Sequence, residues 1–145
     1  MKLCGDLAEL APPFRAAVEQ LLERLRAAGY EPVVHETYRS PERAAALAEG
    51  GSGIAQSMHC LRIAADVTCA RHGYDCGKHG CDFYQRLGAA AELLGMTWGG
   101  RWPKRDLVHV QGVPLVAQNQ ARRSTPAEID LLVAEYLHAP GPRVA

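Results

Sequence analysis

One short segment constrains the fold of this chain more than any other. Residues 63–68 read Ile-Ala-Ala-Asp-Val-Thr, so the large side chains of Ile63 and Val67 alternate with smaller or polar residues that include Asp66. This alternation is typical of a β-strand that is covered by apolar side chains on one face only. It therefore predicts a sheet that packs against helices on one side and leaves its other side free for chemistry.

Apolar spacing and breaker residues predict the elements around this strand. They indicate helices over 12–28, 41–49, 83–94 and 126–136, and short strands over 33–38, 96–98 and 108–111. The 145 residues contain no repeat and no long linker, which favours a single domain over 1–145 with residues 139–145 as a frayed tail. We therefore expect the α+β class, with a small antiparallel sheet.

Composition narrows the range of partners and compartments. Lys plus Arg equals Asp plus Glu at 16 each, and no apolar run approaches the length of a membrane span. The balance of charges argues against nucleic acid as a partner, and the lack of a long apolar run argues against a membrane. We expect a monomer. Asp6 and Glu9 stand where a signal peptide would be apolar, which favours synthesis in the cytoplasm. Five cysteines, an odd number, favour reduced thiols or a metal over a disulfide framework.

Two histidines and one carboxylate form a candidate metal set. His59 precedes Asp66 by seven positions, and His109 follows 43 residues later. Because seven is an odd separation, a continuous strand would aim His59 and Asp66 at opposite faces, so we place His59 on the loop that enters the strand. Ala64, on the same face as Asp66, leaves room for an ion. Three protein ligands leave the fourth tetrahedral position of zinc open for water.

The short sequence motifs around these residues resemble those of a known family. Residues Ser57 to Asp66 carry the pattern S-x-H-x-x-x-x-A-x-D, Tyr38-Arg39-Ser40 lies upstream, and Trp98-Gly99-Gly100 precedes Asp106-x-x-His109. In this order they resemble the zinc peptidoglycan peptidases that include D-alanyl-D-alanine carboxypeptidases and phage L-alanyl-D-glutamate endopeptidases. The resemblance implies the hedgehog/DD-peptidase fold, with helices on one face of the sheet and the zinc site on the other.

The resemblance also implies a role for each site residue. His59, Asp66 and His109 would hold one catalytic zinc, Asp106 would be the acid/base carboxylate, and Arg39 would polarise the substrate. Ser57 would orient a ligand through a hydrogen bond. Without the resemblance, Asp106 reads as a turn residue and Arg39 as a surface cation at the sheet edge.

Two residues depart from the family pattern. Arg62 stands where many relatives carry glycine, and Arg101 follows the Trp-Gly-Gly word where aspartate is common. Arg101 would change the charge at the rim of the cleft, and Trp98 and Trp102 either line that rim or belong to the core.

A Cys/His-rich segment is not explained by the resemblance. Residues 69–81 break the periodicity and predict a loop whose candidate ligands have the spacing of zinc pairs: Cys69, His72, Cys76, His79 and Cys81. A second, structural zinc competes here with a disulfide formed after release from the cell and with reduced thiols.

These observations favour a zinc peptidase that cleaves peptidoglycan stem peptides, as an L-alanyl-D-glutamate endopeptidase of the phage endolysin type. Such an enzyme would reach the cell wall after release from the cytoplasm. The alternatives are a D-Ala-D-Ala carboxypeptidase or dipeptidase, and a catalytically silent zinc-fold binding module.

Overall fold

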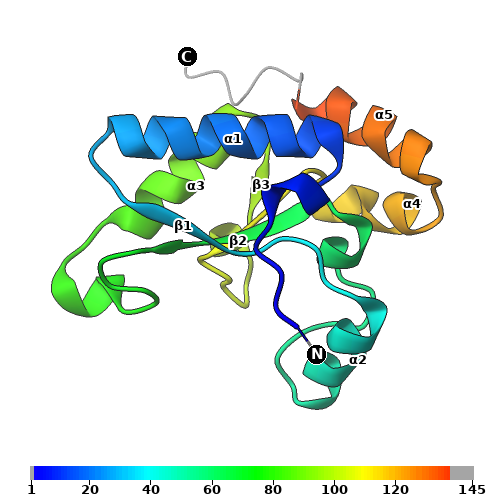
Figure 1. The fold of residues 1–145 in the computed structure, drawn as a ribbon, viewed down its shortest axis with the longest axis horizontal. Coiled ribbons are helices and arrows are strands. Elements are labelled where there is room, and N and C mark those ends of the chain that lie inside the picture. The colour runs from blue at the N-terminus through cyan, green and yellow to red at the C-terminus, as the bar shows by residue number, and fades with distance from the viewer. Residues whose placement is uncertain (1, 138–145) are drawn as a thin grey trace.

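In the computed structural model, which describes residues 2–137, four short strands form one antiparallel sheet (Figure 1). The strands are β1 (Pro32–Glu36), β2 (Ala64–Cys69), β3 (Thr97–Trp98) and β4 (His109–Gln111), and their order across the sheet is β1-β2-β4-β3. The predicted α+β fold is confirmed. The tail predicted at 139–145 lies outside the described residues.

The register of the sheet aligns three polar residues. Glu36 on β1 pairs with Asp66 on β2, and Asp66 pairs with His109 on β4. Cross-strand partners in an antiparallel sheet point to the same face, so these three side chains share the uncovered face. An irregularity between Val34 and Glu36 shifts the register of β1 and brings Glu36 opposite Asp66.

The three longest helices cover the other face of the sheet. They are α1 (Pro12–Ala27), α3 (Phe83–Leu93) and α5 (Pro126–Leu137), and α1 runs across the sheet with contacts to both of the others (Figure 1). Helix α1 starts with two prolines, which suit a first turn, and buries Phe14, Val18, Leu21 and Leu25 at helical spacing. No helix within residues 2–137 combines the length and hydropathy that a membrane span requires.

Shorter helices and turns lie outside this layer. They are α2 (Pro41–Glu49), α4 (Gln118–Arg122) and five 3₁₀ turns: η1 (Leu7–Glu9), η2 (Met58–Leu61), η3 (Cys76–His79), η4 (Gly99–Arg101) and η5 (Leu115–Ala117). The strand predicted over 33–38 ends two residues early, because Thr37 donates its backbone N–H to Cys4 O at 2.7 Å. The loop predicted over 69–81 contains the end of β2 and the turn η3.

Trp98 is a core residue held between two glycines. It is only 9% exposed, and its indole Nε1–H donates to Leu107 O at 2.8 Å. A Cβ atom built on Gly88 of α3 would lie 2.3 Å from the ring, and one built on Gly100 would lie 2.1 Å from it. The Trp-Gly-Gly word therefore docks the segment before β4 against α3.

This packing makes Gly88→Ala a test of the fold. Alanine gains about 1 kcal/mol over glycine in a helix interior, but its methyl group would overlap the Trp98 ring. We expect a net loss of about 1 to 3 kcal/mol in the free energy of unfolding, measured by urea denaturation.

Gly50→Ala is the matched control, because its Cβ would meet only carbonyl oxygens at 3.6 Å or more. It should match the parent or be slightly more stable. A Gly88→Ala variant that unfolds at the parent midpoint would contradict this packing of Trp98.

Candidate metal centre

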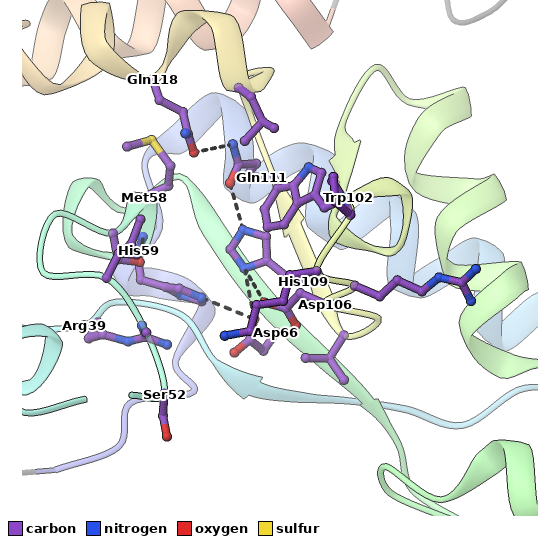
Figure 2. A pocket seen from close by; sticks show the side chains of 18 of the residues that line it. Arg39, Ser52, Met58, His59, Asp66, Trp102, Asp106, His109, Gln111 and Gln118 are labelled. Carbon is purple, nitrogen blue, oxygen red and sulfur yellow. Dashed lines mark hydrogen bonds and ion pairs between the residues drawn. The ribbon is translucent and has the colours of Figure 1, made fainter. Parts of the chain in front are cut away.

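Three elements bring the candidate ligands together on the uncovered face of the sheet. His59 lies in η2, Asp66 lies in the middle of β2, and His109 is the first residue of β4 (Figure 2). One ligand atom from each lies within 4.8 Å of the other two. Ser57 accepts the backbone N–H of His59 at 3.1 Å and caps η2, so it positions this histidine through the backbone.

A backbone carbonyl fixes the tautomer of His59. Its Nδ1 lies 2.8 Å from Thr37 O, and a carbonyl oxygen can only accept. His59 therefore carries its proton on Nδ1, and in the neutral ring Nε2 offers a lone pair. That Nε2 lies 3.2 Å from Asp66 Oδ1.

A chain of amides fixes the tautomer of His109. The Gln111 Nε2 donates to Val113 O at 2.8 Å and to Gln118 Oε1 at 3.0 Å, so its Oε1 must face the imidazole. His109 Nε2 lies 2.8 Å from that oxygen and donates to it, which leaves Nδ1 with the lone pair in the neutral ring. Nδ1 lies 3.3 Å from Asp66 Oδ1.

The donor set fits a divalent cation. Two imidazole lone pairs face one carboxylate oxygen, and the protons of both neutral rings are used elsewhere. Such groups repel one another unless a positive charge lies between them. Two nitrogens and one oxygen are ligands that zinc accepts, and three protein ligands leave a coordination position open.

The pKa shifts of the same residues also favour a positive charge at this position. Burial raises the pKa of Asp66, but hydrogen bonds from His109 and His59, which form when the facing nitrogens carry protons in place of a metal, outweigh it and hold that pKa far below its usual range. Burial lowers the pKa of His109, but the hydrogen bond and the charge of Asp66 outweigh it and raise the net value. The carboxylate is thus ionised and favours a cation beside it.

Asp106 lies beside this cluster at the entrance to β4. Its carboxylate is about half exposed, and Oδ2 lies 3.9 Å from His109 Nδ1. Burial raises the pKa of Asp106, His109 lowers it and Asp66 raises it, and the net value is above the usual range. Gly99 lies against it: a Cβ there would meet Asp106 O at 2.5 Å and His109 Cβ at 3.3 Å.

Arg39 is buried at the site through ion pairing with Glu36. The Arg39 Nη2 donates to Glu36 Oε1 at 2.7 Å, and Arg43 Nε donates to Glu36 Oε2 at 2.7 Å. Burial raises the pKa of Glu36, but the hydrogen bonds from Arg39 and Arg43 outweigh it and lower the net value. Arg39 Nε is buried and has no hydrogen-bond partner within the described part of the chain.

The three candidate ligands, Asp106 and Arg39 all line one cavity of about 800 Å³ (Figure 2). Its walls come from residues 51–54 after α2, from the turn at 57–59, from β2 and β4, and from residues 102–106. Trp102 lines it, and its ring centre lies 5.2 Å from that of His109. Tyr74, Lys104 and Arg105 line it as well.

One expectation for the rim of the cleft was wrong, and one open alternative is resolved. Arg101 is paired with Glu92 of α3, its Nη2 donating to Oε1 at 2.9 Å, and it does not line the cavity. Trp98, the other rim candidate, belongs to the core. The rim cations are Lys104 and Arg105.

The Cys/His-rich segment divides into two groups. Cys69, Cys76 and Cys81 converge, while the rings of His72 and His79 stack on each other with centres 4.1 Å apart. The spacing suggested Cys-His pairs, but the fold groups the three cysteines together and the two histidines together instead.

Three residues that hold the site were not recognised from sequence as its supports: Thr37, Glu36 and Gln111. Gln111 follows His109 by two positions in β4, so strand alternation puts both side chains on the same face, which is the signal that could identify it. A buried glutamate and a backbone carbonyl leave no comparable signal, because the bulge that positions Glu36 and the contact of Thr37 O with His59 appear only in the folded chain.

An open set of two imidazoles and a carboxylate on a small antiparallel sheet, with Asp106 and Arg39 beside it, is typical of the metallopeptidase class. Residues 50–112 match the sequence model of a family described as D-alanyl-D-alanine carboxypeptidase. Over 100 residues, 68% of its length, the chain is 33% identical to the L-alanyl-D-glutamate peptidase of Listeria phage A118. It spans 36% of the length of that curated relative.

A solved structure shares the fold of this chain. The L-Ala D-Glu endopeptidase ChiX of Serratia marcescens matches with a TM-score of 0.56 and 23% identity, over 72% of this chain and 81% of that one. The segment that carries the candidate ligands is thus similar in sequence to the family described as D-alanyl-D-alanine carboxypeptidase and to an L-alanyl-D-glutamate peptidase.

The support of His109 can be tested with Gln111→Leu. Leucine fills a similar volume but cannot accept the Nε2–H, so the ring is free to adopt the other tautomer. We expect the zinc affinity, measured by competition with a chromophoric chelator, to fall roughly ten- to hundredfold.

Gln118→Leu is the control, because Gln118 contacts the amide of Gln111 and not the imidazole. It should change the affinity much less. Equal affinities for Gln111→Leu and the parent would show that His109 is oriented by other contacts.

Proposed function

We propose that this chain is a zinc-dependent peptidase that hydrolyses peptidoglycan stem peptides at the bond between L-alanine and D-glutamate. The observation that carries the proposal is the convergence of His59, Asp66 and His109, with both imidazole tautomers fixed, in a cavity that also holds Asp106 and Arg39. A catalytic zinc at these ligands supplies a nucleophile at neutral pH and polarises the scissile carbonyl.

Asp106 is the residue that moves the proton. Its carboxylate reaches the cavity and is not needed as a ligand, because the other three donors complete the set. Its raised pKa suits a group that takes a proton from water and passes it to the leaving amine. Gly99 allows the chain at Asp106 to pack closely enough to keep this carboxylate beside His109.

Arg39 stabilises the negative charge that develops on the substrate. Glu36 holds one edge of the guanidinium, which makes the side chain rigid before substrate arrives. The backbone N–H of Arg39 also donates to His59 O at 3.2 Å, so the arginine and the turn η2, which carries His59, are fixed to each other. A silent binding module has no need of a buried arginine and a half-buried carboxylate beside the ligands, which favours the enzyme.

The shape of the cavity supports cleavage within a polymer. The walls come from segments on both sides of the metal ligands, and a volume of about 800 Å³ accommodates several residues of a peptide. Lys104 and Arg105 line the same cavity and suit a substrate that carries carboxylates, which the stem peptide does. We place this activity at the cell wall, after synthesis in the cytoplasm, as for an endolysin.

Asp106→Asn tests the proton transfer. The amide has nearly the same shape but cannot carry the proton, so we expect hydrolysis to fall by a factor of about 10² to 10⁴ while zinc content is unchanged. Metal analysis and turnover of purified peptidoglycan measure the two quantities. Asp130→Asn on α5 is the matched control and should behave as the parent. Parent-level turnover in Asp106→Asn would make Asp106 a turn residue only.

A comparison of two substrates identifies the bond that the enzyme cuts. Incubation with intact peptidoglycan should release new D-glutamate amino termini, detected by mass spectrometry of the digest. A soluble pentapeptide that ends in D-Ala-D-Ala should release little free D-alanine. The reverse pattern would overturn the endopeptidase assignment and favour a carboxypeptidase, with Lys104 or Arg105 binding the terminal carboxylate.

A further inference from the structure

Three thiols converge where β2 ends, in a group separate from the candidate metal centre. Cys69 ends β2, Cys76 begins η3, and Cys81 follows that turn. Their sulfur atoms all lie within 4.8 Å of one another, and none of the three is in a disulfide. Cys69 and Cys76 are buried and Cys81 is partly buried.

We propose that Cys69, Cys76 and Cys81 bind a second metal ion of the zinc type, separate from the catalytic centre. Tetrahedral zinc with Zn–S bonds of about 2.3 Å requires sulfur atoms about 3.8 Å apart. The three thiols are thus within about 1 Å of that arrangement. Sulfur-rich sets select zinc and other soft ions, whereas the nitrogen and oxygen set around Asp66 does not discriminate in this way.

The fourth ligand comes from the imidazole pair beside the thiols. His72 and His79 stack with their planes 12° apart, and both line a hollow of about 320 Å³ together with Cys69 and Cys81. Each histidine also follows a cysteine by three positions, so it is tied to a ligand-bearing turn. One ring that turns toward the sulfur atoms completes a closed set of three thiolates and one imidazole, which is typical of structural zinc.

The local structure explains why an ion is useful here. Gly73, Gly77 and Gly80 interrupt the segment, and many of its side chains are exposed, so apolar burial contributes little. Its backbone hydrogen bonds close short turns, among them Gly73 N–H donating to Cys69 O at 2.7 Å and Cys81 N–H to Cys76 O at 2.9 Å. A disulfide would join two thiols and leave the third buried beside it, whereas one ion uses all three.

The proposed ion also bears on the catalytic cleft. Tyr74 lies between Cys69 and Cys76 in the sequence and lines the main cavity. Its ring packs edge-on against the ring of His35, with the two ring centres 6.1 Å apart. An ion that binds both cysteines fixes the two ends of the segment that carries Tyr74. The second site therefore sets one wall of the cavity without taking part in the reaction.

Cobalt substitution of the full chain tests the proposal. Thiolate ligands give Co²⁺ an intense near-ultraviolet charge-transfer band that nitrogen and oxygen ligands do not give. Under a phosphine reductant, we expect this band in the parent protein and about two equivalents of Zn²⁺ per chain. Asp66→Ala should keep the band and about one equivalent, which separates this site from the catalytic one.

Variants of single cysteines identify the ligands. Cys81→Ser, at the most exposed thiol of the three, should weaken the band and lose one metal equivalent, while Cys4→Ser outside the cluster should leave both unchanged. Loss of peptidase activity with the band intact would count against the proposed function alone. A parent protein that binds one Zn²⁺ and shows no band after reduction would overturn the second site, as would a band that Cys81→Ser leaves intact.

Discussion

The pairing of Asp66 with His109 across β2 and β4 is the contact on which the rest of the site depends. Because side chains alternate between faces with a period of two, a slip of one residue in this register would turn one of the two ligands into the core. The register is strongly specified, since Ala65 and Val67 are fully buried beneath the helices. Core packing on one face thus determines ligand geometry on the other.

The ligands are held by contacts that end on backbone carbonyls. Thr37 O fixes His59, and the Gln111 amide transmits the position of Val113 O to His109. Each support is a hydrogen bond at 2.8 Å between buried groups, so neither ring can turn without leaving a polar atom unpaired. Preorganisation of this kind removes the need to order the ligands when the metal binds.

The fold and the convergence of the three candidate ligands could be predicted from local pattern and from the resemblance, because both leave signals in short sequence motifs. The supporting role of Glu36 could not be predicted, because it arises from a bulge in β1 and from ion pairs with Arg39 and Arg43. Arg101 was misplaced because its sequence neighbours gave no hint of Glu92 on α3. The grouping of the three thiols likewise depends on where β2 ends and η3 begins.

Arg62 shows how the turn between two ligands is made without the glycine that many relatives carry. It adopts φ 65° and ψ 26° directly after η2, a conformation that costs a residue with a Cβ about 1 to 2 kcal/mol. Its side chain offsets part of this cost by pairing with Glu9 and by lying 4.0 Å above the Tyr38 ring. The left-handed residue reverses the chain between His59 and β2, which lets two candidate ligands at an odd separation face each other.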